Sequence, residues 1–150
     1  MDFLVREASA QDARAIATFQ IAMARETEHR ELDAETVIAG VTGVLQNPKH
    51  GFYLVATEQK TVVASLLLTF EWSDWRNGVF WWIQSVYVGP NWRRRGIFRA
   101  LFAEVKRRAQ EDEAVRGLRL YVERDNAEAQ MVYARLGLSE TPYRICEVEF

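Results

Sequence analysis

The chain has 150 residues, of which 49% are hydrophobic and 27% are charged, and its formal net charge at pH 7 is −2. The length predicts one domain over residues 1–150, and the composition excludes a disordered chain. The slightly negative charge excludes a general attraction to nucleic acid, and the single cysteine, Cys146, excludes a disulfide framework and a cysteine-rich zinc site.

The first segments of the chain predict one strand and two helices. Residues 3–8 read as a strand, and no secretory signal pattern is present there. Ser9 is a suitable helix N-cap, with Asp12 in the first turn of the helix that follows. Asp33 is a suitable N-cap for a second helix, which Asn47-Pro48 ends.

A group of strands comes next. Strands are expected over residues 51–57, 61–72 and 79–88, and Asn77-Gly78 is the strongest hairpin signal in the chain. The apolar run within residues 62–70 indicates a strand buried on both faces and is too short to span a membrane. With one cysteine and no targeting pattern, a cytoplasmic protein without a membrane partner is expected.

The second half predicts two helices that each precede a strand. A helix is expected from Gly96 to about Gln110, followed by a strand over residues 118–122. A short helix begins at Asp125 or Asn126 and is stopped by Gly137, and a last strand runs from Tyr143 to Phe150. Strands and helices do not alternate throughout, so the fold class is mixed α+β.

The chemistry of the chain is concentrated between residues 86 and 102. Pro90 stops a strand that ends at Val88, and Arg93, Arg94 and Arg95 stand before the helix that starts near Gly96. Free N–H groups at a helix N-terminus and arginine side chains together form an anion site. The alternative is an ordinary strand–turn–helix whose arginines face solvent, and these residues alone leave both interpretations open.

This segment resembles the signature of the GNAT superfamily of N-acetyltransferases, [Gln/Arg]-x-x-Gly-x-[Gly/Ala], at Arg93-Arg94-Arg95-Gly96-Ile97-Phe98. Phe98 departs from it, because a small residue is usual there. The stretch from Asn126 to Leu138 is similar to the second signature, Asn-x-x-Ala-x-x-x-Tyr-x-x-x-Gly-[Phe/Leu]. The family implies a mostly antiparallel sheet of about six to seven strands that splays after strand four, flanked by about four helices.

The resemblance also implies an activity, which is transfer of the acetyl group of acetyl-CoA to a primary amine by direct attack in a ternary complex, without a metal. The acceptor would be a small molecule, a peptide or a protein. The resemblance implies that Tyr133 protonates the departing thiolate and that Asn126 contacts the cofactor. From the residues alone, Tyr133 is also explained as a core tyrosine and Asn126 as a helix cap. The cofactor-binding residues implied around the first signature are Val86, Tyr87, Val88, Arg93, Arg94, Arg95, Gly96, Ile97, Phe98 and Arg99.

A general base is harder to assign. Many relatives carry a glutamate on the fourth strand near the position of Gln84, and an amide cannot accept a proton. Glu71 is the preferred candidate because a strand residue is held rigidly, and it shares a strand face with Thr69 and Leu67. The alternatives are water, or one of the side chains Asp74, Glu26, Glu28, Glu31, His29 and His50.

Two further interpretations stay open. Trp72, Trp75, Trp81 and Trp82 lie on one hairpin and cannot all face the core, so some of them wall an acceptor pocket or cover a homodimer surface. Because Gln84 replaces the usual glutamate and Phe98 departs from the signature, a non-catalytic acyl-CoA-binding or sensor domain is the alternative to an enzyme.

Overall fold

The computed structural model describes residues 3–150, which form two compact units that meet in sequence between Leu120 and Tyr121. The first unit contains a five-stranded sheet, and the second unit contains one helix. In chain order the elements are β1 (Phe3–Glu7), η1 (Ala10–Asp12), α1 (Ala13–Glu28), α2 (Ala34–Gln46), β2 (Phe52–Glu58), β3 (Thr61–Ser73), β4 (Gly78–Val88), η2 (Pro90–Trp92), α3 (Ile97–Glu111), β5 (Val115–Leu120) and α4 (Ala127–Arg135).

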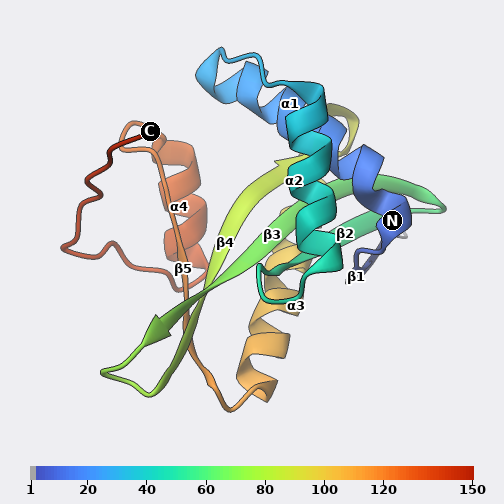
Figure 1. Cartoon of the computed structure of the whole chain (residues 1–150). Helices are drawn as coiled ribbons and strands as arrows, with labels where there is room; N and C mark the ends of the chain where they lie inside the picture. Colours follow the sequence, from blue (N-terminus) through green and yellow to red (C-terminus); the bar gives the residue numbers. More distant parts are fainter. Residues whose placement is uncertain (1–2) are drawn as a thin grey trace. The chain divides into compact units, whose positions relative to one another are not determined.

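The sheet follows the order of the chain. Its strands lie in the order β1-β2-β3-β4-β5, antiparallel except for the parallel pair β4 and β5. Within this unit α1 and α2 cover one face of the sheet and α3 lies against the other (Figure 1). The parallel pair requires a crossover connection, which α3 supplies. The mixed α+β class is confirmed.

Local capping explains where the first helices begin. Asp12 is the last residue of the short 3-10 turn η1 that leads into α1. It accepts a hydrogen bond from the N–H of Ser9 at 2.8 Å and two more from Arg6 at 2.8 and 3.0 Å. Asp33 accepts from both the N–H and the hydroxyl of Thr36, at 2.9 and 2.6 Å. Both predicted helix starts are confirmed, because each depends on contacts within a few residues.

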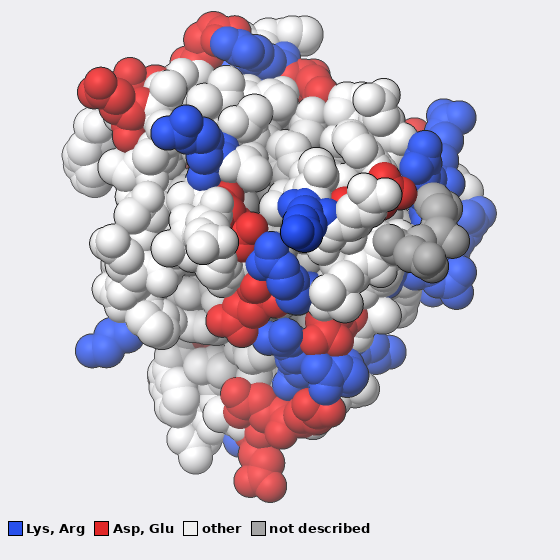
Figure 2. Space-filling model, turned by 90° about the vertical axis from the view of Figure 1, so that its right-hand side faces the viewer, with Lys and Arg blue, Asp and Glu red and all other residues white. Residues whose placement is uncertain are grey.

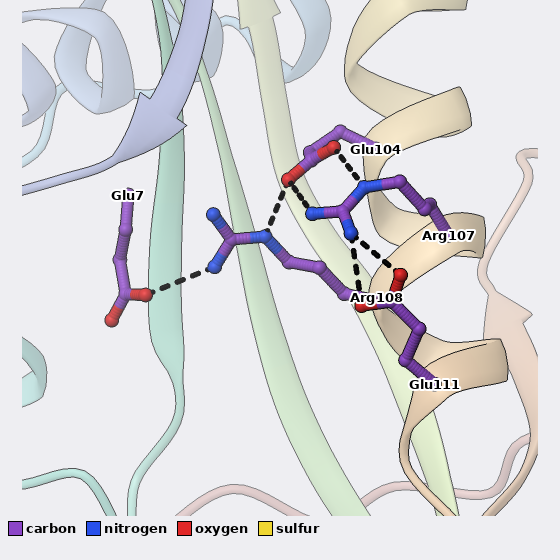
Figure 3. Close-up of polar contacts among 5 residues, drawn as sticks. All are labelled: Glu7, Glu104, Arg107, Arg108 and Glu111. Atoms are coloured by element: carbon purple, nitrogen blue, oxygen red, sulfur yellow. Dashed lines mark hydrogen bonds and ion pairs between the residues drawn. The ribbon is translucent and has the colours of Figure 1, made fainter.

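Polar contacts link α3 to β1 and link successive turns of the helix. Arg108 donates to Glu7 of β1 at 3.0 Å and to Glu104 at 2.7 Å, as Figure 3 shows. Arg107 bridges Glu104 and Glu111 on the solvent side. Hydrogen bonds from the two arginines lower the pKa of Glu104 to about 2, so its carboxylate stays ionised at neutral pH. On its buried face α3 packs Ile97, Leu101, Phe102, Val105 and Ala109 into the core.

Basic and acidic side chains are intermingled on the face drawn in Figure 2. Blue and red groups alternate along a band across the middle of this face, and red groups gather below it. This distribution agrees with the net charge of −2 and gives that face no extended basic surface.

Two parts of the predicted fold need correction. The sheet described over residues 3–150 has five strands rather than six to seven. The segment from Tyr143 to Phe150, predicted as a strand, has no regular structure. No strand is present among residues 121–150, which form the unit that contains this segment. A strand needs a neighbouring strand to hydrogen-bond its backbone N–H and C=O groups. Alternation of side chains predicts the faces of a strand but cannot supply that partner.

Candidate active site

The turn between β4 and α3 contains the predicted anion site, defined as residues 93–99. Arg94 and Gly96 there adopt positive φ angles of 63° and 79°. The first hydrogen bond of α3 runs from the N–H of Ala100 to the carbonyl oxygen of Gly96, at 3.0 Å. The N–H groups of residues 97–99 therefore lie at the free N-terminus of the helix, where the positive end of the helix dipole favours an anion.

Strand β4 separates from β5 just before this turn, in the region where the splay is expected. The ladder with β5 ends at the pair Ile83–Leu120, whereas the ladder with β3 continues to Val88. A bulge at Ser85, whose φ angle is 50°, places one extra residue of β4 opposite β3. Beyond Ile83, the edge of β4 that faced β5 has no strand partner among residues 3–150, so an extended ligand can hydrogen-bond there.

The arginines of the signature differ in what they contact. Arg93 donates from Nε to the carbonyl oxygen of Val88 at 2.9 Å and from Nη2 to Glu26 at 2.7 Å. Arg95 lies 3.9 Å from Glu58, which also accepts a hydrogen bond from the indole of Trp92 at 2.8 Å. Glu26 and Glu58 thus hold the two sides of the loop. Arg94 and Arg99 have exposed side chains.

Phe98, the departure from the signature, packs along the helix. Its ring lies 6.4 Å from the ring of Phe102, one turn further on, and Phe102 is buried. The side chain is half-buried, and its N–H is one of the groups at the free helix N-terminus. The aromatic side chain of Phe98 therefore leaves the free N–H groups of the predicted anion site in place.

Glu71, the predicted base, lies in a polar cluster on the face of the sheet that also carries Gln84. Its two carboxylate oxygens accept hydrogen bonds from Arg119 of β5 at 2.8 and 3.0 Å. The indole of Trp82 donates to the same carboxylate at 3.2 Å, and the Arg119 guanidinium lies 3.8 Å from the centre of the Phe80 ring. Glu71 is therefore a carboxylate that is ion-paired with Arg119.

Sequence reasoning missed Arg119. The available signal was a charged residue between Leu118 and Leu120 in the otherwise uncharged strand predicted over residues 118–122. Gln84 is occupied as well, because its amide donates to the hydroxyl of Thr69. The hydrogen-bonded amide is held in place, but it has no basic group with which to remove a proton.

The alternative bases lie on exposed surface. Glu31 accepts two hydrogen bonds from Arg25, and Glu28, His29, His50 and Asp74 are exposed. Of the hairpin tryptophans, Trp81 is buried beside Phe52 at 5.3 Å, whereas Trp72 and Trp75 are 62% and 87% exposed. The homodimer surface stays a prediction.

The second unit carries the other two predicted site residues. Asn126 caps α4, accepting a hydrogen bond from the N–H of Ala129 at 3.1 Å. Gly137, with a φ angle of 92°, ends the helix, and the N–H of Leu138 reaches back to the carbonyl oxygen of Tyr133 at 3.0 Å. Tyr133 is half-buried, and burial raises the pKa of its phenol, which keeps the hydroxyl protonated at neutral pH.

The sheet of this mixed α+β fold thus has a fourth strand that diverges from the fifth and leads into a free helix N-terminus. The sequence model of the acetyltransferase (GNAT) family matches residues 10–138, and the chain belongs to this family. No match was found among curated proteins. A possible acetyltransferase from Clostridium difficile 630 is 44% identical, with a TM-score of 0.93 over 99% of this chain and 97% of that chain.

Two more distant structures share the fold. One is a predicted acetyltransferase with acetyl-CoA from Clostridium acetobutylicum, 17% identical, with a TM-score of 0.79 over 99% of this chain and 96% of that one. The other is AAC(6')-Iy in complex with a bisubstrate analog, CoA-S-monomethyl-acetylneamine, 16% identical, with a TM-score of 0.77 over 100% of this chain and 99% of that one. Over residues 3–150, no helix is long and apolar enough to cross a membrane.

Proposed function

We propose that the chain is an N-acetyltransferase that moves the acetyl group of acetyl-CoA to a primary amine by direct attack in a ternary complex. The observation that carries this function is the open edge of β4 leading directly into the anion site. An extended amide-bearing arm fits the first feature, and a pyrophosphate fits the second. The neighbours named with acetyl-CoA and with a CoA-linked bisubstrate analog support the choice of cosubstrate.

In this proposal each region of the chain has one task. The backbone of Val86, Tyr87 and Val88 hydrogen-bonds the pantetheine arm, and the N–H groups of residues 97–99 bind the pyrophosphate, with Arg94 and Arg99 adding charge. Asn126 contacts the cofactor arm. Tyr133 supplies a proton to the departing thiolate, and Glu71, directly or through water, takes a proton from the acceptor amine.

Calorimetry with acetyl-CoA, followed by a thiol-release assay with a panel of amines and peptides, tests the function. We expect binding without a divalent cation that weakens as salt is added, because part of the attraction is Coulombic. We also expect thiol release with at least one amine. Lack of binding at millimolar acetyl-CoA, or a requirement for a divalent cation, would contradict the proposal.

A non-catalytic acyl-CoA-binding domain is the second candidate. The observation that favours it is that two polar side chains on the same face of the sheet are already hydrogen-bonded within the protein. Gln84 donates to Thr69, and Glu71 accepts from Arg119. This alternative predicts the same binding of acetyl-CoA, with no thiol release above the uncatalysed rate for any amine in the panel.

The role of Glu71 gives a separate prediction. If Glu71 removes the proton, Glu71→Gln flattens the limb of the pH–rate profile that rises with pH, because the amide cannot be deprotonated to an active form. The affinity for acetyl-CoA should not change, since the hydrogen-bond partners of Glu71, Trp82 and Arg119, lie outside residues 86–99. Asp74→Asn, in the turn after β3, is the matched control and should keep the limb. A Glu71→Gln profile equal to that of the wild type would eliminate Glu71 as the base.

A further inference from the structure

One carboxylate connects three separate elements beside the anion site. Glu26, in the last turn of α1, accepts a hydrogen bond from the hydroxyl of Tyr87 of β4 at 2.8 Å on one oxygen. Its other oxygen accepts from Nη2 of Arg93 at 2.7 Å. The partners are 61 and 67 residues away in sequence, so the contacts are long-range and bring the end of α1 to the start of the anion site.

Arg93 also contacts strand β4. Its Nε donates to the carbonyl oxygen of Val88, the last residue of β4, at 2.9 Å. The guanidinium also lies 5.3 Å from the centre of the Tyr87 ring, which is itself buried and tilted against the Phe19 ring at 5.2 Å between centroids. The leading arginine of the signature thus contacts Val88, Glu26 and Tyr87, with its side chain 45% exposed.

The protonation states support this arrangement at neutral pH. The hydrogen bond from Arg93, followed by that from Tyr87, lowers the pKa of Glu26, so the carboxylate is ionised. Burial, together with the bond to Glu26, raises the pKa of Tyr87, so its hydroxyl remains a donor. Without Arg93, an ionised Glu26 would stand beside the anion site and oppose a phosphate.

We propose that Glu26 is a positioning residue for acetyl-CoA: it fixes Arg93 against the end of β4 and thereby holds residues 93–99 in their anion-binding conformation. The inference rests on the proposed function, because it takes acetyl-CoA as the ligand. It assigns Arg93 to the support of the loop rather than to the phosphates, which leaves Arg94, Arg99 and the backbone N–H groups to contact them.

A double-mutant cycle tests the inference with acetyl-CoA as the titrant. Glu26→Gln and Arg93→Gln should each weaken binding about 3–10-fold, the range for losing one charged hydrogen bond at a partly exposed site. The double variant should bind no more weakly than the weaker single variant, because both substitutions break the same contact. The KM for acetyl-CoA should rise in parallel, with kcat changed less than about twofold, since the loss is in binding.

Salt dependence separates support from direct contact. The slope of log affinity against log salt should be the same in the wild type and in the Glu26→Gln/Arg93→Gln double variant, because the neutral pair leaves the local net charge unchanged. The slope should be smaller for Arg94→Gln, which removes a charge proposed to contact the phosphates. Glu31→Gln is the matched control for affinity, because it breaks another exposed ion pair, between Arg25 of α1 and Glu31 in the segment after that helix.

The outcomes divide cleanly. Additive losses in the cycle, or a salt slope in the double variant that is smaller than in the wild type, would make Arg93 a phosphate ligand and overturn the inference. Equal affinity of Glu26→Gln and the wild type would overturn it too, while leaving the proposed function standing. Failure of the wild type to bind acetyl-CoA would instead refute the proposed function and this inference with it.

Discussion

Tyr133→Phe is expected to lower the rate of thiol release by about 10²–10⁴-fold, the usual loss when a general acid is removed. The substitution deletes one hydroxyl and keeps the ring, which is half-buried on α4. Burial raises the pKa of this phenol, so the hydroxyl carries its proton throughout the neutral range in which the assay is run. The fold and the affinity for acetyl-CoA should both be retained.

The assay needs conditions under which chemistry limits the rate, since slow product release would hide the effect. Tyr143→Phe, at a tyrosine 73% exposed in the same unit, is the matched control and should leave the rate unaltered. If Tyr133→Phe turns over as fast as the wild type with chemistry limiting, Tyr133 has only a packing role on its helix.

Gly96→Val is expected to weaken acetyl-CoA binding by about 10²-fold. At its φ angle of 79° a β-branched residue is strained, although open space lies where its Cβ would stand. The cost therefore comes from the backbone and not from a clash. To relieve it, the chain must leave the left-handed region, which turns the N–H groups of residues 97–99 away from one common point.

Two comparisons make the measurement by calorimetry specific. Gly137→Ala introduces a side chain at another left-handed glycine, with a φ angle of 92°, and should lower the melting temperature without weakening acetyl-CoA binding. Arg94→Ala should weaken binding less than Gly96→Val. The reverse order would mean that side-chain charge, and not the approach of the backbone, provides most of the attraction.

Much of the fold could be predicted because its signals are local. The N-caps at Asp33 and Asn126 and the stop at Gly137 involve contacts within a few residues, and all three are present in the structure. The Asn77-Gly78 turn and the strands on either side of it also follow from short-range geometry, with Asn77 at a φ angle of 47°. The strand predicted from Tyr143 to Phe150 is absent, and no local signal could have supplied the partner that it needed.

The candidate site shows the same difference between local and long-range contacts. The sequence by itself determined the strand–turn–helix geometry of the predicted anion site, because a strand, a proline turn, a glycine and a helix start are contiguous and place the N–H groups at one point. Only the tertiary structure decided the partners of the side chains: Glu26 with Arg93, and Glu71 with Arg119 across 48 residues. Such pairs depend on strand register, and the single extra residue at the Ser85 bulge shifts that register and the facing of every side chain beyond it.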